Sequence, residues 1–250
     1  MKERFLTVPN IPYSNVSSLI ISDRLPEIIS ELEKSDIRVI VSEELSSVKG
    51  SERYHADMSF CHTGNDELYL SCNISNQLKY KLKGEGFQLT ETSMPVSARN
   101  PYLNICIIGR NVICNRKTAE SKLIKKLEDQ NYNILHTNQG YSKCSTAVVS
   151  ENAVITSDDS IYELCAANHI DVLKIVPGHI LLDGYPYGFI GGCCTLISKD
   201  TLAFSGSIES HPDYLSIKSF AKNHGKMLIS MSDKPLYDIG GAVLLKEFVQ

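Results

Sequence analysis

The sequence repeats one order of elements about five times, and this repeat constrains the fold more than any other feature. Each copy predicts two short strands, an amphipathic helix and a third strand, with roughly 35 to 50 residues between copies. In the third copy, residues 104–115 hold two apolar runs around a turn at 109–111, which is typical of a hairpin. Apolar residues then recur with helical spacing over 117–130, and a strand is predicted within 131–140.

The first copy lacks its opening strand, and the far end of the chain supplies a candidate for it. Residues 236–245 follow the fifth copy and read like residues 189–197, because a Gly-Gly pair precedes an apolar run in both. A repeat that cannot bury its own apolar face must stack on neighbours, and closing the stack removes exposed sheet edges. The pattern predicts an α/β fold, a five-bladed propeller of ββαβ units around a central channel, closed by the C-terminal strand. The alternative is an open α/β sandwich of similar units.

The composition agrees with a single domain over residues 1–250. Of these, 42% are hydrophobic and 22% are charged, which is enough for a sizeable core. The apolar runs are shorter than the roughly 20 residues of a membrane helix, and no signal-peptide pattern opens the chain, so we expect no membrane partner and a cytoplasmic location. The net charge of −4 argues against a nucleic-acid surface, because binding to phosphate rests on clustered Lys and Arg.

The eight cysteines include no CxxC pair, and in a cytoplasmic chain this predicts free thiols and no metal site. Cys144, Cys193 and Cys194 stand where a predicted first strand begins, so the ring would place them at its channel. A thiol there becomes a nucleophile when a neighbouring His or cation favours the thiolate. The alternative for the adjacent Cys193 and Cys194 is packing, because consecutive residues of a strand point to opposite faces and one must be buried.

Other reactive side chains fall at the same depth in the predicted ring. His55 and Asp57 alternate along a strand predicted at 54–58 and so point the same way, which lets His55 move a proton beside a carboxylate. The alternative is that His55 and Asp57 are an ordinary pair on a strand whose side chains only satisfy each other's polar groups. Carboxylates, a histidine and a thiol around one channel suit a planar cation, because guanidinium pairs bidentately with carboxylate and its carbon accepts a thiolate. The candidates for holding such a substrate are Asp57, Lys143, Ser145 and Asp238.

A loop and two Gly-Gly pairs also bear on the predicted channel. The loop 178–189 leads into the fifth copy, and its His179 and Asp183 are placed to cap the channel; the alternative is a turn-rich connection. The pairs Gly191-Gly192 and Gly240-Gly241 do not stand in a strand-to-helix turn. We therefore expect them to allow close packing around the channel rather than to bind phosphate.

The motifs HADMSF at 55–60 and GGCCTL at 191–196, together with the fivefold ββαβ order, resemble the pentein superfamily of guanidino-group-modifying enzymes. This superfamily includes the arginine and agmatine deiminases, dimethylargininase and the amidinotransferases. The resemblance spans the whole chain in architecture and only these motifs in chemistry. It implies that Cys193 or Cys194 is the nucleophile of a covalent amidino intermediate, that His55 is the general acid and base, and that Asp57 holds the guanidinium. It implies no metal and no organic cofactor.

The chain also departs from the family pattern. In the family the His-x-Asp element lies in the blade just before the cysteine blade, whereas here that blade carries Lys143-Cys144-Ser145. The carboxylate pair that grips the substrate has no counterpart that we can place. We expect an uncharacterised bacterial branch of the superfamily, a cysteine-dependent hydrolase or transferase acting on a guanidino-type small molecule. The alternative is a non-catalytic ring that binds a protein or ribosomal partner, as translation initiation factor six of the same fold does.

Overall fold

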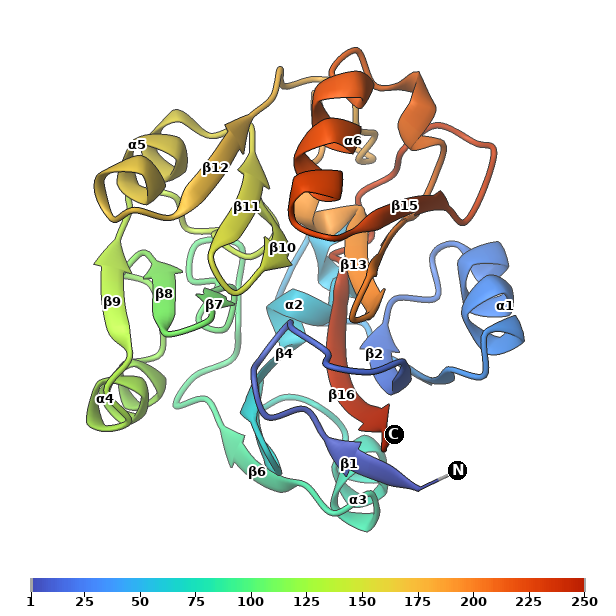
Figure 1. Ribbon diagram of the computed structural model, residues 1–250. Helices are drawn as coiled ribbons and strands as arrows, with labels where there is room; N and C mark the ends of the chain where they lie inside the picture. Colours follow the sequence, from blue (N-terminus) through green and yellow to red (C-terminus); the bar gives the residue numbers. More distant parts are fainter. Residues whose placement is uncertain (1, 250) are drawn as a thin grey trace.

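Five small sheets surround a common centre, and the helices that connect their strands lie at the periphery (Figure 1). The computed structural model describes residues 2–249. Four sheets have three strands each and one has four, in the order β1-β16-β2-β3. In each unit the first strand is antiparallel to the second, and the second is parallel to the third. This is the predicted five-bladed α/β arrangement of ββαβ units.

The second to fifth units follow one order of elements. The second comprises β4 (Phe60–Gly64), β5 (Glu67–Leu70), α3 (Asn76–Gly84) and β6 (Gln88–Glu91). The third comprises β7 (Cys106–Ile108), β8 (Asn111–Cys114), α4 (Ser121–Asp129) and β9 (Asn133–His136). The fourth comprises β10 (Thr146–Ser150), β11 (Ala153–Thr156), α5 (Asp159–Ala167) and β12 (Asp171–Lys174). The fifth comprises β13 (Cys194–Ser198), β14 (Thr201–Phe204), η3 (Ile208–Ser210), α6 (Tyr214–Asn223) and β15 (Met227–Ser230).

The first unit takes its opening strand from the end of the chain, as the sequence predicts. It comprises β2 (Val16–Ile21), α1 (Pro26–Lys34) and β3 (Arg38–Val41). The strand β16 (Ala242–Phe248) pairs antiparallel with β2, with Val243 opposite Ile20. On its other edge β16 pairs with β1 (Glu3–Phe5), a strand that the sequence pattern does not predict. The first sheet therefore joins the two ends of the chain.

The apolar faces of the units meet in two clusters of buried side chains, one largely from the first, fourth and fifth units and the other largely from the second and third. The helix α4 shows why these segments are helical, since Leu123, Ile124 and Leu127 are buried on one face while charged residues cover the other. Burying each such side chain contributes about 1.5–3 kcal/mol. Within residues 2–249 no helix is long and apolar enough to cross a bilayer.

The strand predicted at 54–58 is wrong. This segment forms the end of a 3-10 helix, η1 (Ser51–Tyr54), and a short α-helix, α2 (Ala56–Ser59), joined at His55. The alternation of apolar and polar residues is typical of a strand with one solvent-exposed face. Here Ala56 and Asp57 are both buried, because the polar side chains face the centre of the molecule instead of solvent. A similar helical turn, η2 (Ile190–Gly192), precedes β13.

Candidate active site

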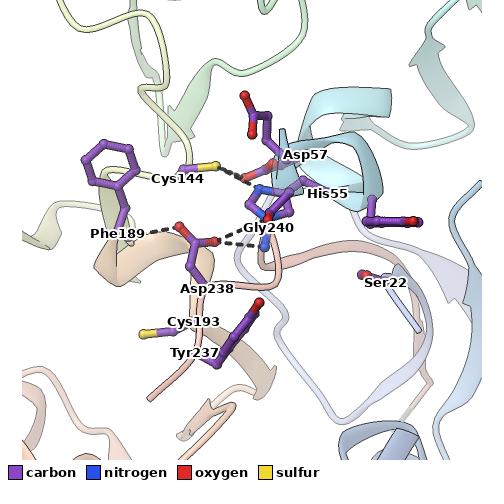
Figure 2. A network of polar contacts seen from close by, with 12 residues as sticks. Ser22, His55, Asp57, Cys144, Phe189, Cys193, Tyr237, Asp238 and Gly240 are labelled. Atoms are coloured by element: carbon purple, nitrogen blue, oxygen red, sulfur yellow. Dashed lines mark hydrogen bonds and ion pairs between the residues drawn. The ribbon is translucent and has the colours of Figure 1, made fainter. Parts of the chain in front are cut away.

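Four reactive side chains from three separate segments meet at the centre of the molecule (Figure 2). His55 and Asp57 come from the turns before β4, Cys144 precedes β10, and Asp238 precedes β16. Their exposed fractions are 3%, 2%, 1% and 1% respectively. The Cys144 thiol donates to Asp57 Oδ2 at 2.8 Å, and its sulfur lies 4.0 Å from His55 Nδ1. His55 Nε2 in turn lies 3.8 Å from Asp238 Oδ1, so His55 bridges the thiol and the second carboxylate.

Asn104 orients the thiol, and sequence reasoning missed it. Its Nδ2 donates to Cys144 Sγ at 3.2 Å, while its Oδ1 accepts from the backbone N–H groups of Lys143 at 2.9 Å and Cys144 at 3.2 Å. The amide therefore fixes both the backbone and the sulfur. Its signal in the sequence is its place just before the first strand of the third unit, which matches the place of Cys144 in the fourth.

Burial determines the protonation of the site. It raises the pKa of Asp57 to about 6, although His55, the thiol hydrogen bond and Lys143 favour the carboxylate. Burial also raises the pKa of Cys144 well above its usual value, and the negative charges of Asp57 and Asp238 raise it further. In the ligand-free protein Cys144 is therefore a thiol at neutral pH. A positive charge placed beside it would favour the thiolate.

Glycines let the backbone approach this cluster closely, as the sequence predicts for the Gly-Gly pairs. Asp238 accepts from the N–H of Phe189 and from the N–H of Gly240, each at 2.9 Å (Figure 2). A Cβ on Gly192 would lie 1.8 Å from Asp238 Oδ1, and one on Gly240 would lie 2.3 Å from the Cβ of His55. Gly240 also has a φ of +77°, which other residues rarely adopt.

Replacing Gly192 by alanine is expected to lower the free energy of unfolding by about 3 kcal/mol or more, because the new methyl group displaces a buried carboxylate. Urea unfolding of the two proteins measures the effect. The matched control is Gly84→Ala at the end of α3, where nothing lies within 4 Å of the added Cβ. That change is expected to be neutral or slightly stabilising. A Gly192→Ala protein as stable as its parent would contradict the close packing of Asp238.

A cavity of about 160 Å³ lies against Cys144. The loop 178–189 borders it, as predicted, although His179 and Asp183 do not line it; Asp183 instead pairs with Arg24 at 3.0 Å. Asp57 also stays outside the lining. It lines a separate small pocket of about 20 Å³, which Lys143 lines as well. The lining residues of the larger cavity are Glu52, His55, Tyr141, Cys144, Leu182, Tyr185, Tyr187, Phe189 and Asp238.

The other predicted residues lie around this cluster without lining the larger cavity. Cys193 is buried, donates to the Ile190 carbonyl at 3.3 Å, and has its sulfur turned away from His55 (Figure 2). Cys194 is buried at the start of β13, and burial raises the pKa of its thiol to about 12. Ser145 is buried, and its hydroxyl has no hydrogen-bond partner within residues 2–249. Of the three candidate thiols, the structure brings Cys144 to His55 and Asp57.

The same cluster offers one ligand atom each from His55, Cys144 and Asp238, and these atoms lie within 4.8 Å of one another. A nitrogen, a thiolate sulfur and a carboxylate oxygen form a donor set that zinc accepts. Cys144 Sγ also lies 2.8 Å from Asp57 Oδ2, so the sulfur contacts a carboxylate outside this donor set.

The arrangement of five ββαβ units is the pentein fold, which guanidino-group-modifying enzymes share. The inosamine-phosphate amidinotransferase of Streptomyces griseus matches with a TM-score of 0.61 and 10% identity over 99% of this chain and 98% of that one. The saxitoxin-pathway amidinotransferase SxtG of Microseira wollei gives 0.59 and 12% over 91% of each chain. The DDAH of Pseudomonas aeruginosa gives 0.56 and 9% over 93% of this chain and 99% of that one.

Identities this low show the common fold and no more. The chain belongs to a family of unknown function, DUF6873, whose model matches residues 20–243. No curated protein matches the sequence.

Proposed function

We propose that this protein is an enzyme that acts on a guanidino-type small molecule, as a hydrolase or a transferase, with Cys144 as its nucleophile. One observation carries the proposal: the buried Cys144 thiol lies at the wall of a cavity, donates to Asp57, and stands beside His55. The structural neighbours support the substrate class, since they include two amidinotransferases and the agmatine deiminase of C. jejuni.

The geometry supports the following first half of the reaction. A guanidinium cation enters the cavity and offsets the negative charge that holds the Cys144 pKa high. The thiol proton passes along its hydrogen bond to Asp57, whose raised pKa makes it a better proton acceptor than an ordinary carboxylate. The thiolate then forms an S–C bond to the guanidinium carbon, and a C–N bond breaks. His55, which lies beside Asp238, gives a proton to the departing nitrogen.

The second half decides between the two reaction types. A water molecule, or an amine in a transferase, attacks the carbon of the S-amidino intermediate while neutral His55 takes a proton from it. The C–S bond then breaks, and Asp57 returns its proton to the Cys144 sulfur. The protein ends each cycle in its starting protonation state, with no change of redox state at any atom.

A screen of guanidino compounds tests the proposal. The protein is mixed with each compound, quenched in acid, and analysed by mass spectrometry for an adduct on Cys144, while ammonia, amine and ureido products are assayed. Added glycine separates a transferase, which gives an amidinated acceptor, from a hydrolase. Neither an adduct nor a product with any compound would contradict the proposal and would favour the non-catalytic, partner-binding ring.

A further inference from the structure

We propose that Glu52 makes the cavity specific for a small organic cation that has an apolar body and no carboxylate. This inference rests on the proposed function and narrows its substrate class. Glu52 belongs to none of the sequence motifs and takes no part in the proposed reaction.

Glu52 is a buried carboxylate with one oxygen left free. It lies in η1, three residues before His55, and only 4% of it is exposed. Its Oε1 accepts from the Tyr185 hydroxyl at 2.6 Å, whereas its Oε2 has no hydrogen-bond partner in the described part of the chain. Leaving a buried charged oxygen without a partner is unfavourable, and a bound cation that donates to it offsets this cost. This oxygen lies beside Gly50, and Glu52 lines the cavity, so a cation bound in the cavity is a donor that would satisfy it.

The charges of the cavity wall favour a cation over an anion or a zwitterion. Glu52 and Asp238 line the cavity, and among the described residues its lining contains no Lys or Arg. Both oxygens of Asp238 already accept backbone N–H groups, so the free acceptor belongs to Glu52. A carboxylate on the ligand would meet the two like charges of Glu52 and Asp238, with no Lys or Arg in the described lining to pair with it, and burying a charge without a partner is strongly unfavourable.

Cations do lie nearby, but in a different pocket. A second pocket also borders Tyr185, and its lining includes Arg24, Lys49 and Arg53. There Arg24 pairs with Asp183 at 3.0 Å, and Arg53 pairs with Glu44 at 3.1 Å. A ligand that occupies only the cavity lined by Glu52 therefore forms no ion pair with Arg24, Lys49 or Arg53.

The remaining wall suits the apolar body of the ligand. Tyr141, Tyr185, Tyr187, Phe189 and Leu182 line the same space as Glu52. Aromatic faces pack against alkyl or aryl groups and attract a cation held over them. The volume of about 160 Å³ restricts the ligand to a small molecule. An alkylguanidine or arylguanidine has this combination of charge, shape and size.

Calorimetric binding to the Cys144→Ser protein, in which turnover is blocked, tests the inference. The matched ligands are n-butylguanidine and 4-guanidinobutyrate, which differ by a carboxylate. We expect n-butylguanidine to bind at least tenfold more tightly. Glu52→Gln should weaken its binding about tenfold or more, because a hydrogen bond to a charged group is lost. The control is Glu44→Gln, the same chemical change outside the cavity, which should leave binding unchanged.

The outcomes separate this inference from the proposed reaction. Equal or tighter binding of 4-guanidinobutyrate, or no effect of Glu52→Gln, overturns the inference, even if the parent protein turns over a guanidino compound. Binding of neither ligand overturns it too. Binding of n-butylguanidine that depends on Glu52, without an adduct or product in the parent protein, supports the inference while the proposed reaction fails.

Discussion

Replacing Cys144 by alanine is expected to reduce turnover of a guanidino substrate at least about a thousandfold, because loss of the nucleophile removes the covalent route. The structure assigns this effect to Cys144 in particular, since its sulfur alone of the three candidate thiols contacts both Asp57 and His55 among the described residues. Steady-state kinetics with the best compound from the screen measures the loss. Cys165→Ala, which removes a buried thiol from α5, is the matched control and should keep its activity.

Alkylation identifies the same thiol without a substrate. Because burial and two carboxylates raise the pKa of Cys144, a neutral reagent such as iodoacetamide should label it slowly near pH 7. A cationic reagent of similar size, such as chloroacetamidine, should label it much faster, since its charge offsets the carboxylates. Peptide mapping locates the label. Preferential labelling of Cys193 or Cys194 would contradict the assignment and return the nucleophile to the GGCC motif.

The fold was predictable because the same spacing of apolar residues recurs in each copy of the repeat. The apolar spacing in α4 marks the buried face of a helix, and each repeated copy confirms the reading of the others. Comparison of the copies also shows that the first unit lacks a strand and that the C-terminus has one more than the fifth unit needs. The pairing of β16 with the first unit follows from these two differences. The strand β1 could not be predicted, because it has three residues and two of them, Glu3 and Arg4, are charged, so no alternation of apolar residues marks it.

The site was predictable only in part, because its contacts join segments far apart in the chain. His55, Asp57, Cys144 and Asp238 were all named from the sequence, but the pattern did not show which thiol would face them. That choice depends on the turns before β10 and β13, which direct Cys144 toward His55 and Cys193 toward the Ile190 carbonyl. Glu52 carries no motif at all, and its unusual property, a free buried oxygen, exists only in the folded chain.

Asp57→Asn is expected to stabilise the protein at pH 8 while abolishing activity. Burial raises the pKa of Asp57 to about 6 from its usual 3.8, so folding favours the protonated carboxyl. Below pH 3.8 both the folded and unfolded forms are protonated and no cost arises. As the pH rises, the unfolded chain ionises first, so the free energy of unfolding falls until about pH 6. Above that pH the buried charge costs up to about 3 kcal/mol.

The asparagine variant avoids this cost, since it is neutral at every pH, and its side-chain oxygen can still accept from the Cys144 thiol. Urea unfolding at pH 8 should give it an advantage of about 1–3 kcal/mol that vanishes near pH 4, whereas Asp129→Asn on the exposed end of α4 should show no such trend. A variant less stable than its parent at pH 8 would mean that the attraction of Asp57 to His55 and Lys143 outweighs its burial. Activity should be lost in either case, because an amide cannot hold the thiol proton. Greater stability combined with lost activity would mark Asp57 as a charge that the protein keeps for chemistry at the expense of its own stability.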